Sequence, residues 1–264
     1  MSRIGQTFDV LQRQGKKALI PFITAGYPNL AITEKLIFEV EKKGADLLEL
    51  GVPFSDPMAD GPVIQYSSEC SLAQGTTLKM ILKLVQKVRL KTSLPIILMG
   101  YYNPFFSYGI QRFCADAKRA GVDGVLVVDL PPEEAAEMKS HADAAGLDLI
   151  FLLAPTSNDE RIKIIVKNSS GFIYYVSLTG VTGVRSKLDR DIRGQVEKIK
   201  KITPLPIGVG FGISTPRQAQ KVAKWADAVL VGSAVIKTIQ QSRTPSAIVT
   251  NVGQFISSLK KAID

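Results

Sequence analysis

Short runs of apolar, often β-branched residues recur along the chain and alternate with stretches that mix apolar and charged positions. The apolar runs have the length and composition of parallel strands that are buried on both faces. They predict eight strands, at Ala18–Thr24, Asp46–Val52, Pro95–Tyr101, Asp123–Asp129, Asp148–Leu153, Gly171–Ser177, Pro206–Phe211 and Ala226–Gly232.

The stretches between these runs have the pattern of amphipathic helices. In the first of them, Phe38 and Val40 lie among Lys and Glu residues. Glycines that suit a helix C-cap end several stretches, at Gly44, Gly121 and Gly146. The pattern predicts helices at Leu30–Lys43, Leu78–Lys91, Ile110–Ala120, Pro132–Ala145, Glu160–Lys167, Ile192–Ile202 and Pro216–Lys224.

Strands that alternate with helices form βαβ units and a parallel sheet. Eight such units in 264 residues favour a closed (β/α)8 TIM barrel of the α/β class. Periodicity alone leaves an open, doubly wound sheet as the alternative. Because no linker or change of composition divides the chain, we expect a single domain over residues 1–264.

Composition narrows the class of protein further. Hydrophobic residues make up 45% of the chain and charged residues 22%, as in ordinary globular proteins. No apolar run reaches the roughly 18 residues of a membrane span, and the first 20 residues lack the pattern of a secretory signal. Cys70 and Cys114 have no metal-type spacing. We therefore expect a cytoplasmic protein with reduced thiols, no bound metal and no membrane contact.

The formal net charge of +9 raises the question of nucleic-acid binding. The basic residues are scattered in short pairs, such as Lys16 with Lys17 and Lys42 with Lys43, at helix-like positions. No basic stretch is interleaved with aromatic residues that would stack on bases. We expect solvated helix faces and no nucleic-acid partner.

Glu49 interrupts the apolar run DLLELGV near its C-terminal end, where barrel enzymes place their chemistry. A carboxylate in such a strand is paired, protonated or catalytic, because an unpaired buried charge is costly. Burial would raise its pKa toward neutrality and make it a proton shuttle. A structural Glu bonded to the backbone or to a buried Arg remains the alternative.

The loop after this run carries Asp56 and Asp60, each beside a Pro or Gly, so both could simply organise turns. Two carboxylates from one strand and loop also allow one group to move protons while the other stays ionised.

The last three predicted strands each lead into a glycine-containing loop: SLTGVTGV, GVGFGIS and VGSAV. In barrels, a phosphate often lies at such loops and at a short helix N-terminus, where backbone N–H groups donate to it. Ser233 would add a hydroxyl at an N-cap position. Tight βα turns are the alternative reading of these glycines. Because GVGFG lacks the dinucleotide spacing, the phosphate is expected on a small substrate.

The chain resembles the tryptophan synthase alpha family. The resemblance rests on PFITAGYP, ELGVPFSDPMADGP, LMGYYNP, VVDLPPEE, YYVSLTGVTG, VGFGIS and VGSAV, which occur in this order from Pro21 to Val235. It implies a lyase that splits indole-3-glycerol phosphate into indole and glyceraldehyde 3-phosphate, and that passes indole to a beta subunit for tryptophan synthesis. It also implies an α2β2 (αββα) complex, with pyridoxal phosphate in the beta subunit and no cofactor in this chain.

The same resemblance implies roles for individual residues. Glu49 matches the proton-transfer carboxylate, Asp60 the one that faces the indole nitrogen, and Tyr174 an active-site tyrosine. The residues implied to bind phosphate are Gly183, Gly212, Gly232 and Ser233. Those implied to line the indole pocket are Phe22, Met99, Leu126, Leu152 and Phe211. Asp56 and Thr182 match segments that close over substrate and couple to the beta subunit.

The segment Leu178–Asp191 is long for a βα loop and mixes Gly, Ser, Thr and charged residues, which predicts a lid that orders on substrate binding. Other phosphate-binding barrels would share the glycine loops without needing ELGVPFSDPMADGP. The enzyme that forms indole-3-glycerol phosphate would also be expected to carry lysines on its early strands, and Ile20–Phe22 and Leu48–Leu50 have none. The remaining alternative is a catalytically weak regulatory subunit that activates the beta subunit.

Overall fold

The computed structural model describes residues 2–176, 185–210 and 212–264, with the backbone alone at 185–191. Within these residues, nine parallel strands form one sheet in the order β5-β4-β3-β2-β1-β9-β8-β7-β6. The strands are β1 (Ala18–Thr24), β2 (Leu48–Gly51), β3 (Ile96–Gly100), β4 (Gly124–Val127), β5 (Asp148–Ile150), β6 (Leu152–Leu153), β7 (Ile173–Val176), β8 (Ile207–Gly210) and β9 (Ala228–Val231).

The sheet closes into a barrel through a single stretch of chain. The predicted strand Asp148–Leu153 is divided at Phe151 into β5 and β6. These two short strands are the first and the last in the strand order, so the two edges of the sheet meet here. β5 pairs with β4, and β6 pairs with β7. The N–H of Tyr174 donates to the carbonyl oxygen of Phe151 over 3.2 Å, which bridges the break. The predicted (β/α)8 barrel is confirmed, and the open sheet is excluded.

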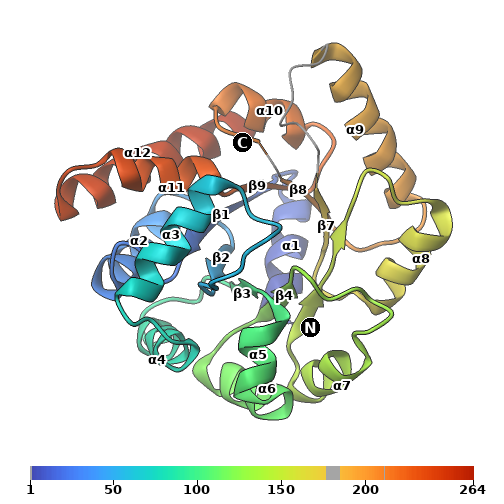
Figure 1. Ribbon diagram of the computed structural model, residues 1–264. Coiled ribbons are helices and arrows are strands. Elements are labelled where there is room, and N and C mark those ends of the chain that lie inside the picture. The colour runs from blue at the N-terminus through green and yellow to red at the C-terminus, as the bar shows by residue number, and fades with distance from the viewer. Residues whose placement is uncertain (1, 177–184, 211) are drawn as a thin grey trace.

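Helices surround the strands in Figure 1. Those at the predicted places are α2 (Leu30–Lys42), α4 (Leu78–Arg89), α6 (Ile110–Ala120), α7 (Ala136–Ala145), α8 (Asp159–Asn168), α9 (Arg185–Lys200) and α10 (Pro216–Ala223). Gly121 and Gly146 are left-handed C-caps as expected, whereas α2 is capped by Lys43 and Gly44 follows it.

Four further helices were not predicted: α1 (Arg3–Arg13), α3 (Pro62–Ala73), α5 (Tyr102–Tyr108) and α12 (Pro245–Ile263). A helix start was expected at Ser233, and α11 (Ser233–Gln241) begins there. The loop predicted at Leu178–Asp191 is wrong over 185–191, because α9 begins at Arg185, whereas its role as a lid stays a prediction. That part of the segment is rich in Arg, Lys and Leu, which are good helix formers. The rest of the predicted lid, including Thr182 and Gly183, lies outside the described residues.

Helix α1 closes the N-terminal end of the barrel. Its buried residues Ile4, Phe8 and Leu11 follow the spacing of one helix face. They pack in one cluster with barrel-facing residues that include Ile20 and Leu47. In Figure 1, α1 accordingly overlaps the centre of the ring of strands instead of joining the outer helices. The C-terminal mouth is therefore the end that is left for substrate.

Successive side chains of each strand point alternately into the barrel and toward the surrounding helices. Tyr174 packs with the cluster inside the barrel, whereas Tyr175 belongs to the larger cluster between the sheet and the helices. Of the two adjacent tyrosines in YYVS, Tyr174 is therefore the one that faces the inside of the barrel. Among the described helices, none combines the length and the apolar character that a membrane crossing requires.

Candidate active site

Glu49 projects from β2 into the barrel. Its strand neighbours Leu48 and Leu50 pack in the cluster on the helix side of the sheet, while Leu47 belongs to the inner cluster. The side chain is 1% exposed, and within the described part of the chain its Oε1 has no hydrogen-bond partner. Burial raises the pKa of Glu49 to about 8. The carboxyl group is therefore mostly protonated at pH 7. The alternative of a structural Glu bonded to the backbone or to a buried Arg does not hold for Oε1, which has no such partner among the described residues.

Asp60 lies in the segment between β2 and α3, at the C-terminal mouth of the barrel. Burial raises the pKa of Asp60 to about 6, and a hydrogen bond from Tyr101 opposes that rise. The Tyr101 hydroxyl donates to Oδ2 of Asp60 over 3.2 Å and accepts from the N–H of Ala59 over 3.0 Å. Asp60 is therefore mostly ionised at pH 7, where Glu49 is mostly neutral.

Tyr174 extends from β7 across β8. A Cβ atom at Gly210 would lie 2.5 Å from the Tyr174 hydroxyl, so only glycine leaves room for the ring there. Burial, followed by the negative charges of Glu49 and Asp60, raises the pKa of Tyr174 well above its ordinary value. The phenol thus stays protonated at physiological pH, as a hydrogen-bond donor close to both carboxyl groups.

A small cavity opens at the mouth beside Asp60. Two of the predicted indole-pocket residues, Phe22 and Met99, line it, together with Gly51, Val52, Asp60, Ile64, Ser68, Gly100, Tyr101 and Val128. Leu126 and Leu152 lie in the inner cluster of the barrel and are not among the lining residues. Phe211 lies outside the described residues. The cavity is thus apolar on most sides and carries one carboxylate and one phenol.

Two of the predicted phosphate residues, Gly232 and Ser233, lie at the start of α11, and Gly183 lies outside the described residues. Ser233 is the first residue of that helix and Gly232 is its N-cap, so the N-cap position predicted for Ser233 is wrong by one residue. A Cβ atom at Gly232 would lie 3.7 Å from Cβ of Phe22, which places this helix start next to the cavity. Gly212 is exposed and has a φ of 71°.

The loop between β2 and Asp60 faces solvent. Asp56 is exposed and accepts a hydrogen bond from the hydroxyl of its neighbour Ser55. Met58 is 88% exposed. An apolar side chain so exposed, beside a buried catalytic candidate, makes this loop a candidate contact for a partner.

Seven residues of the cavity were not among the predicted site residues: Gly51, Val52, Ile64, Ser68, Gly100, Tyr101 and Val128. Tyr101 follows directly after β3, so the rule that chemistry lies at strand C-termini could have found it. Ile64 and Ser68 come from α3, a helix that was not predicted. As for metals, the described residues contain no group of three or more His, Cys, Asp or Glu side chains that could hold an ion.

The fold and the site define a class of protein: a barrel enzyme that uses acid–base chemistry on a substrate with an apolar body. One buried and one half-buried carboxyl group, Glu49 and Asp60, differ in protonation state at neutral pH, which suits such chemistry. The neighbouring start of α11 offers N–H groups to an anionic group of the same substrate.

Comparison with known proteins identifies the family. The family model described as "Tryptophan synthase alpha chain" matches residues 8–264. The tryptophan synthase alpha chain of Geotalea uraniireducens is 58% identical over 263 residues, which cover 100% of this chain and 98% of the relative, and that of Geobacter sp. strain M21 is 56% identical with the same coverage.

Solved structures agree with the sequence comparison. The alpha subunit of Legionella pneumophila tryptophan synthase has a TM-score of 0.93 and 41% identity, and the match covers 100% of this chain and 99% of that chain. A chain of Mycobacterium tuberculosis tryptophan synthase has a TM-score of 0.90 and 30% identity, with the same coverage.

The chain belongs to the tryptophan synthase alpha chain family. It is the lyase subunit that cleaves indole-3-glycerol phosphate, and it forms a complex with the beta subunit, which holds the pyridoxal phosphate. The predicted enzyme class and partner are confirmed.

Proposed function

We propose that Glu49 and Asp60 carry the cleavage of indole-3-glycerol phosphate as an acid and a stabilising carboxylate. The observation that supports this assignment is the difference between the two groups: the pKa of Glu49 is raised to about 8 and that of Asp60 to about 6. Between these values one group holds a proton and the other a negative charge, which the reaction needs at the same time.

The first step is proton transfer to the ring. Neutral Glu49 gives its proton to indole C3, and the ring nitrogen gains positive charge. Ionised Asp60 faces the N1–H and stabilises that charge. The phenol of Tyr174, which stays protonated, donates a hydrogen bond within the site. Glu49 is now a carboxylate beside the hydroxyl next to the ring.

The second step breaks the carbon–carbon bond. The Glu49 carboxylate removes the proton of the side-chain hydroxyl, and the hydroxyl oxygen becomes the aldehyde oxygen of glyceraldehyde 3-phosphate. The electrons of the C–C bond return to the ring, which yields neutral indole. Glu49 ends with a proton again, so the cycle closes without an external acid or base.

The two ends of the substrate have separate places in this proposal. Phe22 and Met99 contact the indole ring in the cavity, and Leu126 and Leu152 support it from inside the barrel. The phosphate lies at the start of α11, where Gly232 and Ser233 offer N–H groups and a hydroxyl, and Gly212 contributes from the loop after β8.

We also propose the composition of the complex, its location and the route of indole, which membership of the family does not establish. We place the chain, as one barrel domain over residues 1–264, in an α2β2 complex in the cytoplasm, where Cys70 and Cys114 are free thiols. Indole would pass directly from this subunit to the beta subunit, with Asp56 in the segment that couples the two sites.

The decisive experiment measures indole released from indole-3-glycerol phosphate by Glu49→Gln and Asp60→Asn. Each variant should lose about 10²–10⁴-fold or more in kcat, because a positioned acid or base contributes that much. Glu134→Gln, at an exposed position in the turn before α7, is the matched control and should keep full activity. Turnover near that of the wild type in either site variant would refute the assignment, and both should be assayed with and without the beta subunit.

A further inference from the structure

A second cavity lies at the end of the barrel opposite the active site. It is formed by the C-terminal end of α1, the end of α9 and the residues that lead into β8 and β9. Its volume is about 330 Å³, within the range of small-molecule sites. The lyase chemistry at the C-terminal mouth makes no use of it.

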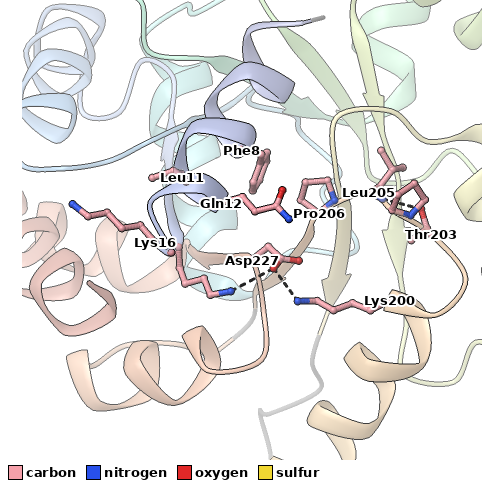
Figure 2. Close-up of a pocket in the computed structure, with 12 residues that line it drawn as sticks. Phe8, Leu11, Gln12, Lys16, Lys200, Thr203, Leu205, Pro206 and Asp227 are labelled. Atoms are coloured by element: carbon pink, nitrogen blue, oxygen red, sulfur yellow. Dashed lines mark hydrogen bonds and ion pairs between the residues drawn. The ribbon is translucent and has the colours of Figure 1, made fainter.

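One wall of this cavity is apolar. Phe8 and Leu11 contribute from α1, and Pro204, Leu205 and Pro206 contribute from the segment before β8. The two prolines have no backbone N–H, so this segment presents mostly carbon to the cavity. In Figure 2, Phe8 and Pro206 stand on the two sides of the Gln12 side chain, above Asp227. A flat ring fits such a wall better than a polar group does.

The opposite side is charged. Nζ of Lys200 lies 2.8 Å from Oδ1 of Asp227, and Nζ of Lys17 lies 3.5 Å from the same oxygen. The other carboxylate oxygen of Asp227 accepts from the N–H of Ile207 over 3.0 Å. Figure 2 shows the dashed contacts converging on Asp227, while Lys16 points away from it.

The charge balance of this group leaves one positive charge uncompensated. Two ammonium groups share a single carboxylate, and each ammonium has three N–H donors, of which one is directed at Asp227. Both lysine side chains are only about a third exposed, at 30% for Lys17 and 37% for Lys200. Lys16 also lines the cavity but is directed away from Asp227, so the group of Lys17, Lys200 and Asp227 matches an acceptor with one negative charge.

We propose that this cavity binds a small aromatic carboxylate, with its ring against the apolar side formed by Leu205 and Pro206 and its carboxylate between Lys17 and Lys200. A singly charged carboxylate neutralises the excess positive charge of Lys17, Lys200 and Asp227, whereas a doubly charged phosphate leaves a net negative charge there. A neutral ring lacks the acceptor that the two ammonium groups require.

The test uses isothermal titration calorimetry of the full chain with benzoate, benzamide and inorganic phosphate as probes. Benzoate should bind saturably at one site. Benzamide, which has the same shape without the charge, and inorganic phosphate, which lacks the ring, should each bind at least tenfold more weakly. No saturable benzoate binding, or equal affinity for benzamide or phosphate, would overturn the proposal.

Variants locate the binding. Lys200→Gln should weaken benzoate binding about tenfold, and Lys200→Arg should retain it because the charge is kept. The fold is preserved in both, since Asp227 keeps Lys17 and the N–H of Ile207. Leu205→Ala should weaken benzoate binding through the apolar wall, and Lys163→Gln, on α8 away from the cavity, should leave it unchanged. Wild-type affinity in Lys200→Gln would show that the probe binds elsewhere, and the proposal would fail.

Discussion

Glu49 shows how one residue can serve function at the expense of stability. Its carboxyl group is removed from water, and one of its oxygens has no hydrogen-bond partner among the described residues. An unpaired polar atom in this position costs free energy of folding. The same burial raises the pKa of Glu49 to about 8, which keeps a transferable proton on the group at neutral pH.

The stability effect has a definite dependence on pH. The pKa of Glu49 rises from about 4.5 in the unfolded chain to about 8 in the fold, so between these values the unfolded chain binds fewer protons. The free energy of unfolding therefore falls as pH rises through this window. The Gln side chain of the Glu49→Gln variant cannot ionise. The free energy of unfolding of this variant, relative to that of the wild type, should therefore increase by several kcal/mol between pH 5 and pH 9, since each pKa unit corresponds to about 1.4 kcal/mol.

Urea denaturation of the two proteins at both pH values measures this difference. Glu134→Gln, whose carboxyl group is exposed, serves as the control and should show no such trend. If the Glu49→Gln variant differs from the wild type by the same amount at pH 5 and pH 9, Glu49 is not held in its neutral form by burial.

The two carboxyl groups also predict the pH profile of kcat/KM. Activity should rise as Asp60 ionises, at a pH of about 6, and fall as Glu49 loses its proton, at a pH of about 8. The Tyr101 hydrogen bond lowers the pKa of Asp60 against the effect of burial, so Tyr101→Phe should move the acidic limb to higher pH. The alkaline limb should stay in place.

Tyr102→Phe is the matched control for that measurement, because the Tyr102 hydroxyl contacts Glu137 and not Asp60. An acidic limb that is unmoved in Tyr101→Phe, or that moves equally in Tyr102→Phe, would show that this hydrogen bond does not set the ionisation of Asp60.

At the scale of elements, α1 determines which end of the barrel is open. Phe8 is 5% exposed, and its ring lies 5.7 Å from that of Phe172, centroid to centroid, at the start of β7. Val10, on the same helix, is 51% exposed. The helix thus buries one face in the N-terminal end of the barrel and presents the other to solvent.

This difference predicts the stability of two variants of one helix. Phe8→Ala should lower the free energy of unfolding by about 3–5 kcal/mol, as large-to-small changes in a core do. Val10→Ala should change it by about 0.5 kcal/mol or less. Chemical denaturation of both variants checks this, and equal effects would mean that α1 does not close the barrel.

The start of α11 and the segment from β2 to α3 are the elements that meet at the mouth. Gly232 lies beside Phe22 and Ile64, so the helix start, the strand β1 and the helix α3 all border one cavity. Their proximity lets one substrate contact an apolar wall, a carboxylate and a helix N-terminus together.

At the scale of the whole molecule, the two ends of the barrel have different surfaces. Met58 follows β2 at the C-terminal mouth and is 88% exposed, whereas Leu90 caps the end of α4, which runs back toward the N-terminal end, and is 85% exposed. Because the proposed active site opens at the mouth, we expect the beta subunit to cover Met58 and not Leu90.

Charged substitutions at these two positions test this orientation. Met58→Asp should weaken the complex with the beta subunit about tenfold, because a charge in an apolar contact of an interface is costly. Leu90→Asp introduces the same change at the opposite end and should leave the affinity unchanged. Surface plasmon resonance with immobilised beta subunit measures both, and an equal loss in the two variants would contradict docking at the mouth.

Much of this molecule was predictable from local pattern. The runs of apolar residues marked the strands, because a strand buried on both faces needs apolar residues at successive positions. Glu49 stood out in such a run, and the string ELGVPFSDPMADGP pointed to the family. Two of the missed helices differ in this respect. The spacing of Ile4, Phe8 and Leu11 could have predicted α1, whereas the buried residues of α3 are serines, so no apolar stripe marks that helix.

The tertiary structure alone decided the protonation states and the neighbours of the site. Burial by residues far apart in the chain sets the pKa of Glu49, and the contact of Tyr101 with Asp60 joins positions 41 residues apart. The chain around Phe151 also joins the two ends of the sheet, β5 and β6, and so closes the barrel. A pKa depends on solvent exclusion in three dimensions, whereas strand and helix patterns depend on spacing along the chain, so the sequence determined the elements and the fold determined their chemistry.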